Sequence, residues 1–547
     1  MRILHLISGG DGGAAASRVL ELLAGLNKTE DVLLVCLVDG SPVREAQARG
    51  IKTLMPQGSR SAVLKQLAQT AQAEGCELLH CLDPGAIQTG RLLKKRSGLP
   101  VVATVWSVPN ADADKRALRE LRRADYRICA SQAVADALHE QCFDPNRSFV
   151  LADAESARQR EIYDTVLRQT ARAEAWPRDG ILIGGAFGKG NSGDNAILQA
   201  MVQTIHELDP DMPIYATTRS PGQTAREAGV GAVHTFQLGQ IRRRMKKTAL
   251  YLSGGGSLIQ DVTSTRSLWY YLHSIQMAKH WGNRVMMFGC GIGPVHHKSN
   301  RKLASWVIRK YVDRITLRDN ASARELERMG VNGIPTRVTA DMAFLVRPAP
   351  PERVEQVCTE CCVKGKIEPG ERMLILAPRP WDGTDRHLSD FAAAAIHAAQ
   401  HYELRPVLLA IEPKKDRGVC ERISALALER GGIDCPVLEA PKDASAVVGL
   451  IRRADAVLGM RLHALIFAAA QGTPFAGVSY DPKVAGFVDY IGQGRCCTLE
   501  QVDAERLCAM VDGLMQASRE ETRAAARRLR ALAAENCEEA LGLLNEK

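Results

Sequence analysis

Aromatic residues and long hydrophobic runs are both scarce in this 547-residue chain. Phe, Trp and Tyr make up only 5% of it, and no stretch interleaves aromatic with basic residues, which argues against a nucleic-acid-binding protein. No apolar run approaches the roughly 20 residues that a membrane-spanning helix requires. The amino terminus, MRILHLISGGDGG, has no hydrophobic core of the kind found in signal peptides, so we expect a cytoplasmic protein.

Two metal and cofactor patterns are also missing. Cys358, Cys361 and Cys362 form a C-x-x-C-C cluster, but no second pair at zinc spacing accompanies it, so we expect no metal site. The 15 cysteines are otherwise scattered in apolar surroundings, which is typical of reduced thiols. The glycines of the loop Gly9–Gly13 lack the spacing of a dinucleotide fingerprint, and we expect no cofactor.

The length of the chain predicts about three domains. Its composition, 46% hydrophobic and 24% charged, is ordinary for a globular protein, and its net charge is +9. The densest basic run is Arg242–Lys247. One interpretation of this run is the solvated face of a helix, and the other is a contact with anionic lipid head groups or with a phosphorylated substrate.

Strand-like apolar runs alternate with amphipathic helical patterns through most of the chain, which predicts an α/β fold with parallel sheets. We predict three Rossmann-like units, and the last two face each other across a cleft. Their expected bounds are residues 1–153, 179–347 and 352–547. A polar, helix-prone segment at residues 154–178 is interpreted as a linker helix, and Pro348, Pro350 and Pro351 mark the second boundary.

Glycine-rich segments follow several strands of the second unit. The turn at residues 187–195 opens a helix, where Asn191 and Asp194 can cap free backbone N–H groups. Gly254, Gly255 and Gly256 follow the next strand, and consecutive glycines are costly to order unless something approaches the backbone. The first segment can equally be a ligand loop or an ordinary βα turn, whereas the second favours a ligand.

The third unit contains the junction Gly459-Met460-Arg461-Leu462-His463 between an apolar strand and an apolar helix. Such junctions bind ligands beyond the carboxyl ends of the strands of an open sheet. Arg461 and His463 can face one pocket only if the chain is still extended at Arg461. We interpret Arg461 as an anion clamp and His463 as a proton donor, against the alternative of a surface arginine and a core histidine.

The amino-terminal segment resembles the first half of the retaining family 4 glycosyltransferases. The shared pattern comprises the loop Gly9–Gly13, the strand around Val101–Val105 and the segment Ile128–Ser131. The half that would bind a nucleotide sugar, with its paired glutamates, does not follow. The resemblance therefore implies an acceptor-binding or docking module in residues 1–153.

Residues 180–495 resemble the polysaccharide pyruvyl transferase family, most closely the bacterial members that modify secondary cell-wall polysaccharide for S-layer anchoring. The motifs are the Gly-Asn-x-Gly-Asp loop, the Gly-Gly-Gly-Ser-Leu-x-Gln-Asp segment and the Gly-Met-Arg-Leu-His junction. The resemblance implies a GT-B-like cleft and transfer of the enolpyruvyl unit of phosphoenolpyruvate to a sugar diol, with release of phosphate. Asn195 stands where the family often has Glu, which leaves the role of that position open.

The chemistry of this reaction suits the residues. An arginine fork matches the anionic donor, and a histidine can supply the proton that the methylene carbon needs. We assign His463 and Arg461 to catalysis and expect Arg379, Lys483 and Gly459 at the donor. Candidates for holding the acceptor, a glycan that is lipid-linked or free, are Asn191, Gly193, Asp194, Gly254, Gly255, Gly256, Asp261 and Arg266. Peripheral contact with the inner face of the membrane is compatible with this role, and a nucleotide-sugar glycosyltransferase and a non-catalytic scaffold are the alternatives.

Overall fold

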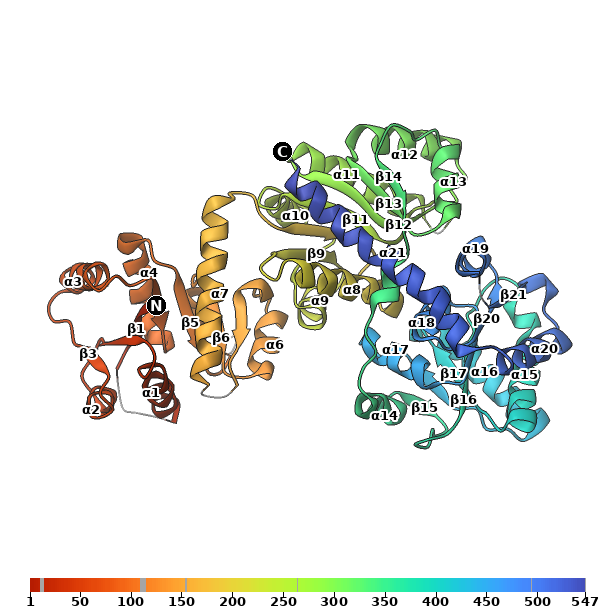
Figure 1. Ribbon diagram of the computed structural model, residues 1–547, viewed down its shortest axis with the longest axis horizontal. Helices are drawn as coiled ribbons and strands as arrows, with labels where there is room; N and C mark the ends of the chain where they lie inside the picture. Colours follow the sequence, from red (N-terminus) through yellow and green to blue (C-terminus); the bar gives the residue numbers. More distant parts are fainter. Residues whose placement is uncertain (10–13, 109–114, 153–154, 263, 493, 547) are drawn as a thin grey trace. The chain divides into compact units, whose positions relative to one another are not determined.

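The computed structural model describes residues 1–9, 14–108, 115–152, 155–262, 264–492 and 494–546 (Figure 1). The chain forms two compact units, Met1–Asp179 with Pro221–Ala232 and Gly180–Ser220 with Val233–Lys547. Three sheets of seven strands each lie within the described ranges. Parallel pairs form the centre of each sheet, such as β1 with β4, β8 with β11 and β16 with β19, and β15 pairs antiparallel with β18. The predicted α/β class, with three Rossmann-like sheets, is confirmed.

The first sheet has the strand order β3-β2-β1-β4-β5-β6-β7. Its inner strands, such as β1, β4 and β5, are almost entirely buried, as expected where helices cover both faces of a parallel sheet. The elements of this unit are β1 (Arg2–Ile7), α1 (Ala14–Leu26), β2 (Asp31–Cys36), α2 (Ser41–Ala48), β3 (Lys52–Leu54), α3 (Arg60–Ala73), β4 (Leu78–Cys81), α4 (Pro84–Ser97), β5 (Val101–Val105), α5 (Lys115–Leu121), β6 (Tyr126–Cys129), α6 (Gln132–Glu140), η1 (Pro145–Arg147), β7 (Ser148–Val150) and α7 (Ser156–Ala175).

Helix α7 lies along the first sheet rather than spanning a gap as a linker (Figure 1). Ile162, Tyr163 and Val166 are buried in the core that β1, β2 and β4 also form. The predicted helix therefore exists, but its apolar face makes it part of the first unit. The predicted linker role is wrong, because burial of that face stabilises the helix on the sheet.

The second sheet has the order β10-β9-β8-β11-β12-β13-β14. The elements from this part of the chain are β8 (Ile181–Gly184), α8 (Ser192–Leu208), β9 (Ile214–Thr218), α9 (Pro221–Ala228), β10 (Gly231–His234), α10 (Leu238–Met245), β11 (Leu250–Ile259), α11 (Thr265–His280), β12 (Arg284–Ile292), α12 (Lys298–Tyr311), β13 (Arg314–Leu317), α13 (Asn320–Arg328), β14 (Thr336–Val338) and η2 (Met342–Leu345). The predicted end of β11 at Ser253 is wrong, since the strand continues through the three glycines to Ile259.

The third sheet has the order β15-β18-β17-β16-β19-β20-β21. The elements here are α14 (Pro351–Glu360), β15 (Cys362–Lys364), β16 (Met373–Ala377), η3 (Thr384–Arg386), α15 (Leu388–Tyr402), β17 (Arg405–Ala410), α16 (Pro413–Gly431), β18 (Val437–Glu439), α17 (Ala444–Arg453), β19 (Ala456–Gly459), α18 (Leu462–Gln471), β20 (Phe475–Ser479), α19 (Pro482–Ile491), β21 (Arg495–Thr498), η4 (Leu499–Gln501), α20 (Ala504–Met515) and α21 (Arg519–Asn545).

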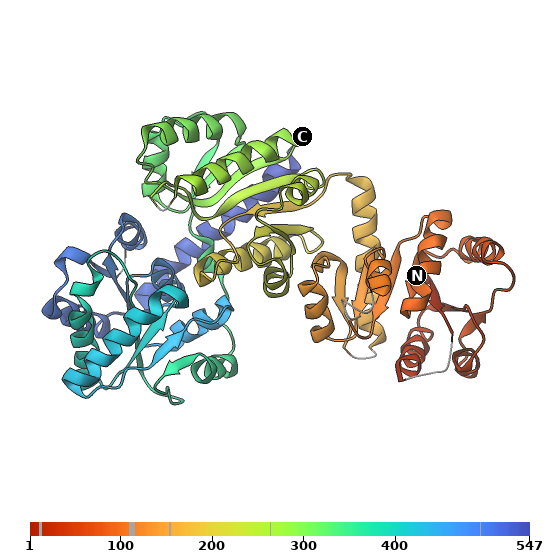
Figure 2. The same ribbon diagram turned by 180° about the vertical axis from the view of Figure 1, so that it is seen from behind.

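The long helix α21 connects the second and third sheets of the larger unit (Figure 1 and Figure 2). It packs against α18 and then reaches η2 and β12. Asn536 of α21 is fully buried, and its Oδ1 accepts a hydrogen bond from Thr339 Oγ1 at 2.7 Å. Glu539 pairs with Arg314 at 3.0 Å. The terminal helix therefore fixes the two sheets in one body and does not merely cover the third.

Candidate functional site

A cleft of about 250 Å³ lies between the second and third sheets. Its lining residues lie at or just beyond the carboxyl ends of parallel strands in both sheets, where open α/β sheets bind ligands. The second sheet contributes Ala186, Asn191, Asp194, Gly256, Ser257, Leu258 and Arg318, and the third contributes Arg379, Ile411, Arg461, Leu462, His463, Tyr480 and Lys483. Most of the polar candidates that the sequence suggests are thus brought to one place.

The junction between β19 and α18 has the geometry that a shared pocket requires. Arg461 is the N-cap of α18 with an extended backbone (φ −79°, ψ 114°), and the helix begins at Leu462. Arg461 and His463 both line the cleft. The condition that the chain is still extended at Arg461 is therefore confirmed.

Two carboxylates hold Arg461. One belongs to Asp416 in α16 and the other to Glu412, the residue directly before α16. Its Nε donates to Asp416 Oδ2 at 2.9 Å, Nη2 pairs with Asp416 Oδ1, and Nη2 lies 3.2 Å from Glu412 Oε2. Asp416 is fully buried. Two of the three guanidinium nitrogens and much of the charge are therefore already used. The clamp expected of Arg461 needs correction, because this side chain first fixes the junction.

The imidazole of His463 lies against the backbone of the facing loop. A Cβ on Gly193 would stand only 2.0 Å from His463 Nδ1, so glycine permits this approach. His463 Nε2 is shielded from solvent and has no partner in the described structure. Burial lowers the pKa of His463 to about 4. In the cleft as it stands the ring is neutral near pH 7, and this differs from the protonated donor that we expected.

The pKa of Asp194 is shifted upward, opposite to that of His463. Asn191 Nδ2 donates to Asp194 Oδ2 at 2.9 Å, and Asn191 Oδ1 accepts from Gly193 N at 3.0 Å. Burial nevertheless raises the pKa of Asp194 to about 7, against the opposing effect of Lys189. The carboxyl group is therefore partly protonated near neutral pH. The cleft holds a neutral base and a carboxylic acid, a pairing typical of acid–base sites.

Arg318 is a cleft residue that the sequence reasoning missed. Its Nη2 donates to Ser257 Oγ at 2.9 Å, and its Nη1 donates to Asp341 Oδ2 at 3.2 Å. The next residue, Asp319, caps α13 by accepting from Ser322 N at 2.7 Å. The signal that could have found Arg318 is its place directly after β13, equivalent to the place of Arg461 after β19.

Arg379 differs from the other cleft arginines in its partners. Its Nη1 donates to Tyr480 Oη at 2.5 Å, and its guanidinium carbon lies 5.0 Å from the ring centre of Trp381 and 4.5 Å from that of Tyr480. Its Nε is buried without a partner, and no described carboxylate pairs with it. Lys483, nearby, pairs with Asp481 at 3.1 Å. Arg379 therefore retains an uncompensated charge at the cleft, held between two aromatic rings.

Several predicted site residues lie away from the lining. A Cβ on Gly254 would stand 2.3 Å from Phe288 O, a Cβ on Gly255 2.7 Å from Ile197 Cγ2, and a Cβ on Gly459 3.3 Å from Ala377 Cβ. Close packing between elements therefore explains these three glycines without a ligand. Gly256 does reach the cleft beside Asp194. The expectation of acceptor or donor contact needs correction for Gly254, Gly255 and Gly459.

Asp261 and Arg266 also lie outside the cleft lining. The Asp261 carboxylate accepts from His296 N, His297 N and Asn300 Nδ2 at 2.7, 3.0 and 2.9 Å, so it organises the turn after β12. Arg266 is exposed on α11. Asn195, where the family often has Glu, accepts from Gly188 N at 3.2 Å and closes its own loop. These contacts correct the acceptor roles expected of Asp261 and Arg266.

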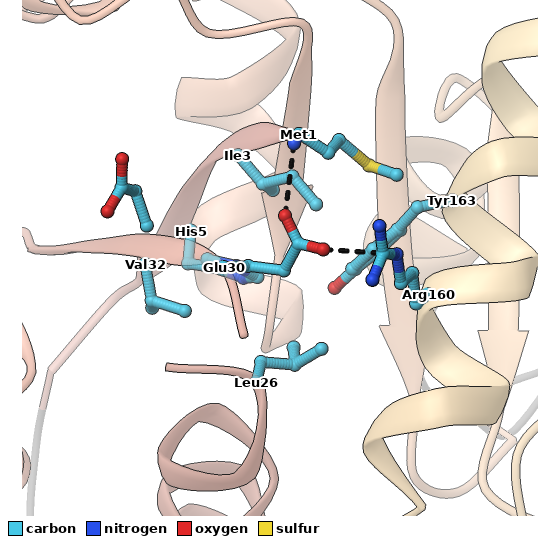
Figure 3. Close-up of a pocket in the computed structure, with 9 residues that line it drawn as sticks. Met1, Ile3, His5, Leu26, Glu30, Val32, Arg160 and Tyr163 are labelled. Carbon is cyan, nitrogen blue, oxygen red and sulfur yellow. Dashed lines mark hydrogen bonds and ion pairs between the residues drawn. The ribbon is translucent and has the colours of Figure 1, made fainter. Parts of the chain in front are cut away.

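The first unit contains a much smaller cavity, of about 10 Å³, beside β1 (Figure 3). Glu30 lies there between the amino group of Met1 and Arg160 of α7, at 3.0 Å from each. This volume admits about one water molecule, so the cavity is a packing feature at the docked helix. The loop Gly9–Gly13, part of the resemblance to family 4 glycosyltransferases, lies outside the described residues except for Gly9.

His, Cys, Asp and Glu side chains with assigned positions form no group of three or more that could hold a metal ion. No helix in the described ranges is both long and apolar enough to cross a membrane.

The fold and cleft can now be compared with known proteins. Solved structures with a similar fold include Anabaena Alr3699/HepE in complex with UDP-glucose (12% identity, TM-score 0.45, covering 67% of this chain and 98% of that one). A glycosyltransferase from Rickettsia africae has 14% identity and a TM-score of 0.45 over 68% of this chain and 100% of its own. A putative UDP-N-acetylglucosamine 2-epimerase from Listeria monocytogenes has 13% identity and a TM-score of 0.44 over 65% and 94%.

Sequence comparisons give the family. Curated proteins include no significant match. The profile described as "Glycosyl transferase 4-like domain" matches residues 13–154, and the profile described as "Polysaccharide pyruvyl transferase" matches residues 191–482. The second match covers more than half of the chain and contains all of the cleft-lining residues except Ala186 and Lys483. The chain is therefore a polysaccharide-modifying transferase and belongs to the polysaccharide pyruvyl transferase family.

Proposed function

We propose that the cleft transfers the enolpyruvyl unit of phosphoenolpyruvate to two hydroxyl groups of a sugar in a cell-wall polysaccharide precursor. The products are a cyclic pyruvate ketal and phosphate. The observation that carries the proposal is Arg379, whose guanidinium faces the cleft without a carboxylate partner among the described residues. A small, multiply charged donor is the kind of ligand that such a group binds.

The neighbouring cations support the same donor. Lys483 and Arg318 also line the cleft, although each has an acidic neighbour. Phosphoenolpyruvate carries a phosphate and a carboxylate, so it needs more than one cationic contact. We assign one anionic group to Arg379 with Lys483, and the other to Arg318 beside the amino terminus of α18. In this proposal Arg461 positions His463 rather than gripping the donor alone.

The two titratable groups suit the proton transfers of the reaction. Asp194, with its raised pKa, donates a proton to the methylene carbon while the first sugar hydroxyl attacks C2. Neutral His463 accepts the proton of that hydroxyl. The histidinium then protonates the bridging oxygen of the phosphate as the C–O bond breaks. The second hydroxyl closes the ketal and returns a proton to Asp194.

Acid–base catalysis of this kind typically accelerates a step by about 10²–10⁴-fold. We therefore expect His463→Ala to abolish detectable phosphate release from phosphoenolpyruvate and a glycan acceptor while the protein stays folded. Near-normal turnover of His463→Ala would contradict the proposed role. Leu303→Ala, an exposed substitution on α12, is a control that should keep full activity.

A parallel reaction with a nucleotide sugar tests the alternative donor. Phosphate release with phosphoenolpyruvate alone supports the proposal, whereas consumption of the nucleotide sugar would favour a glycosyltransferase. Turnover of neither donor would favour a binding scaffold.

We also propose a cytoplasmic reaction on a lipid-linked acceptor, a secondary cell-wall polysaccharide precursor of the kind used for S-layer anchoring. A lipid-linked precursor would bring the enzyme to the inner face of the plasma membrane. The basic run Arg242–Lys247, at α10, supports this location.

A further inference from the structure

Helix α10 of the larger unit exposes a basic and apolar surface. Residues four apart share one side of a helix, so Leu238, Arg242 and Lys246 lie in one row, with Arg243 and Lys247 in the next. Ile241 and Met245 of the same helix are apolar and buried. The exposed rows are therefore turned away from the core of the second sheet.

The cations of this surface are not neutralised by neighbouring carboxylates. In the described ranges none of the side chains from Arg242 to Lys247 forms an ion pair. Three of the five cations lie over aromatic rings instead. Arg242 Cζ and Lys246 Nζ each lie 4.3 Å from the ring centre of Trp281. Arg244 Cζ lies 3.5 Å from the ring centre of Tyr215. A group of five such cations favours an anionic partner.

Apolar side chains stand at the start of the same helix. Phe236 is 58% exposed and Leu238 is 49% exposed. Large apolar side chains rarely remain exposed beside a basic cluster unless an apolar partner covers them. Trp281, partly buried beneath Arg242 and Lys246, adds the residue type that is enriched at membrane–water interfaces.

We propose that this surface, Phe236, Leu238, Arg242, Arg243, Lys246 and Lys247, binds the face of an anionic lipid bilayer. Insertion of Phe236 and Leu238 into the head-group region accounts for their exposure, and the cations match the negative surface potential. A folded protein partner would explain the charge equally but would need a complementary acidic surface, and a nucleic acid would leave the apolar pair uncovered.

The surface lies at the same edge of the second sheet as the cleft residues. Helix α10 begins just after β10, at the carboxyl edge of the second sheet. The cleft residues of this sheet follow β8 and β13 or lie in the last residues of β11, at the same edge. A bilayer under α10 would therefore bring lipid-linked glycans near that edge. This consequence rests on the proposed function, but the lipid contact itself does not.

The test is binding of the full-length chain to vesicles, measured by sedimentation without any substrate. We expect binding to vesicles of phosphatidylcholine with phosphatidylglycerol but not to phosphatidylcholine alone, and weakening by salt. Arg242→Gln with Arg243→Gln should lower the partition coefficient about 30-fold, at about 1 kcal/mol for each cation. Phe236→Ser with Leu238→Ser should lower binding even where salt screens the charges.

The matched control is Arg44→Gln with Arg49→Gln, which removes the same charge from exposed positions of and beside α2 and should leave binding unchanged. Equal loss in both double variants would overturn the proposal, as would no binding to either vesicle. Binding of a DNA oligonucleotide through Arg242 and Arg243 without vesicle binding would assign the surface to nucleic acid instead. Because no turnover is needed, these outcomes are independent of the transferase reaction.

Discussion

The carboxylate of Asp416 binds the guanidinium of Arg461 with both oxygens, and the Nε–Oδ2 distance is 2.9 Å. Asp416 Oδ2 also accepts from Glu412 N at 2.8 Å, so the start of α16 and the start of α18 share one buried ion pair. The pair fixes the residue two positions before His463. The position of the His463 imidazole therefore depends on a carboxylate that does not itself line the cleft.

Asp416→Asn tests this relationship. The substitution keeps the shape of the side chain but leaves Arg461 buried with Glu412 as its remaining acidic partner at 3.2 Å. Breaking a buried pair costs about 3–5 kcal/mol, so we expect a clearly lower melting temperature and reduced activity. Glu421→Gln, which breaks an exposed pair with Arg417, is the control and should cost less than about 1 kcal/mol. Equal melting temperatures for the two variants would contradict the structural role of Asp416.

Gly193→Ala tests the contact between Gly193, in the first turn of α8, and His463, in the first turn of α18. The new Cβ would stand 2.0 Å from His463 Nδ1, so the imidazole must move, although Gly193 has an ordinary helical backbone. We expect kcat/KM to fall about 100-fold, since a displacement of about 1 Å can have that effect. Gly418→Ala, where nothing lies within 4 Å of the new Cβ, is the matched control. Full activity of Gly193→Ala would show that the position of His463 is not critical.

Arg379 should determine the affinity for the donor. Arg379→Ala removes the uncompensated charge, and we expect KM for phosphoenolpyruvate to rise about 10- to 100-fold with a smaller change in kcat. Arg379→Lys keeps the charge but loses the planar fork between Trp381 and Tyr480, so its KM should be intermediate. Steady-state kinetics with varied phosphoenolpyruvate measure this. Arg386→Ala, nearby and exposed, should behave as the wild type.

Asp194 should give both stability and activity a dependence on pH. Burial raises its pKa from 3.8 to about 7, so between these values the folded state binds a proton that the unfolded state releases. The stabilising contribution is therefore present at low pH and is lost as pH rises through about 7. The melting temperature of the wild type should fall over this range relative to that of Asp194→Asn. A difference between the two proteins that is constant from pH 5 to 8 would contradict the raised pKa.

The same group should limit turnover at high pH. If protonated Asp194 supplies the proton to the methylene carbon, kcat/KM should decrease above about pH 7. Asp194→Asn cannot donate this proton and should lose activity by about 10²–10⁴-fold at every pH. A decrease at high pH that persists in a still active Asp194→Asn would assign it to another group.

Strand ends were the most predictable part of the site. Arg461, His463, Arg379 and Lys483 follow apolar strand patterns, and the carboxyl ends of parallel strands meet at one edge, so their convergence could be inferred from sequence order alone. The glycines were less predictable. Gly254 and Gly193 look alike in sequence, but the first permits strand packing and the second permits contact with His463. Only the residue that packs against each glycine in the folded protein distinguishes the two roles.

The sequence by itself determined the three parallel sheets and the set of residues at their ligand-binding edges, because hydrophobic periodicity and chain order are local properties. The tertiary structure decided what each of those residues does. Asp416 neutralises Arg461, whereas Arg379 meets two aromatic rings and no described carboxylate. Burial moves the pKa values of Asp194 and His463 in opposite senses. Charge compensation and desolvation depend on neighbours that are distant in the chain, and no local pattern reports them.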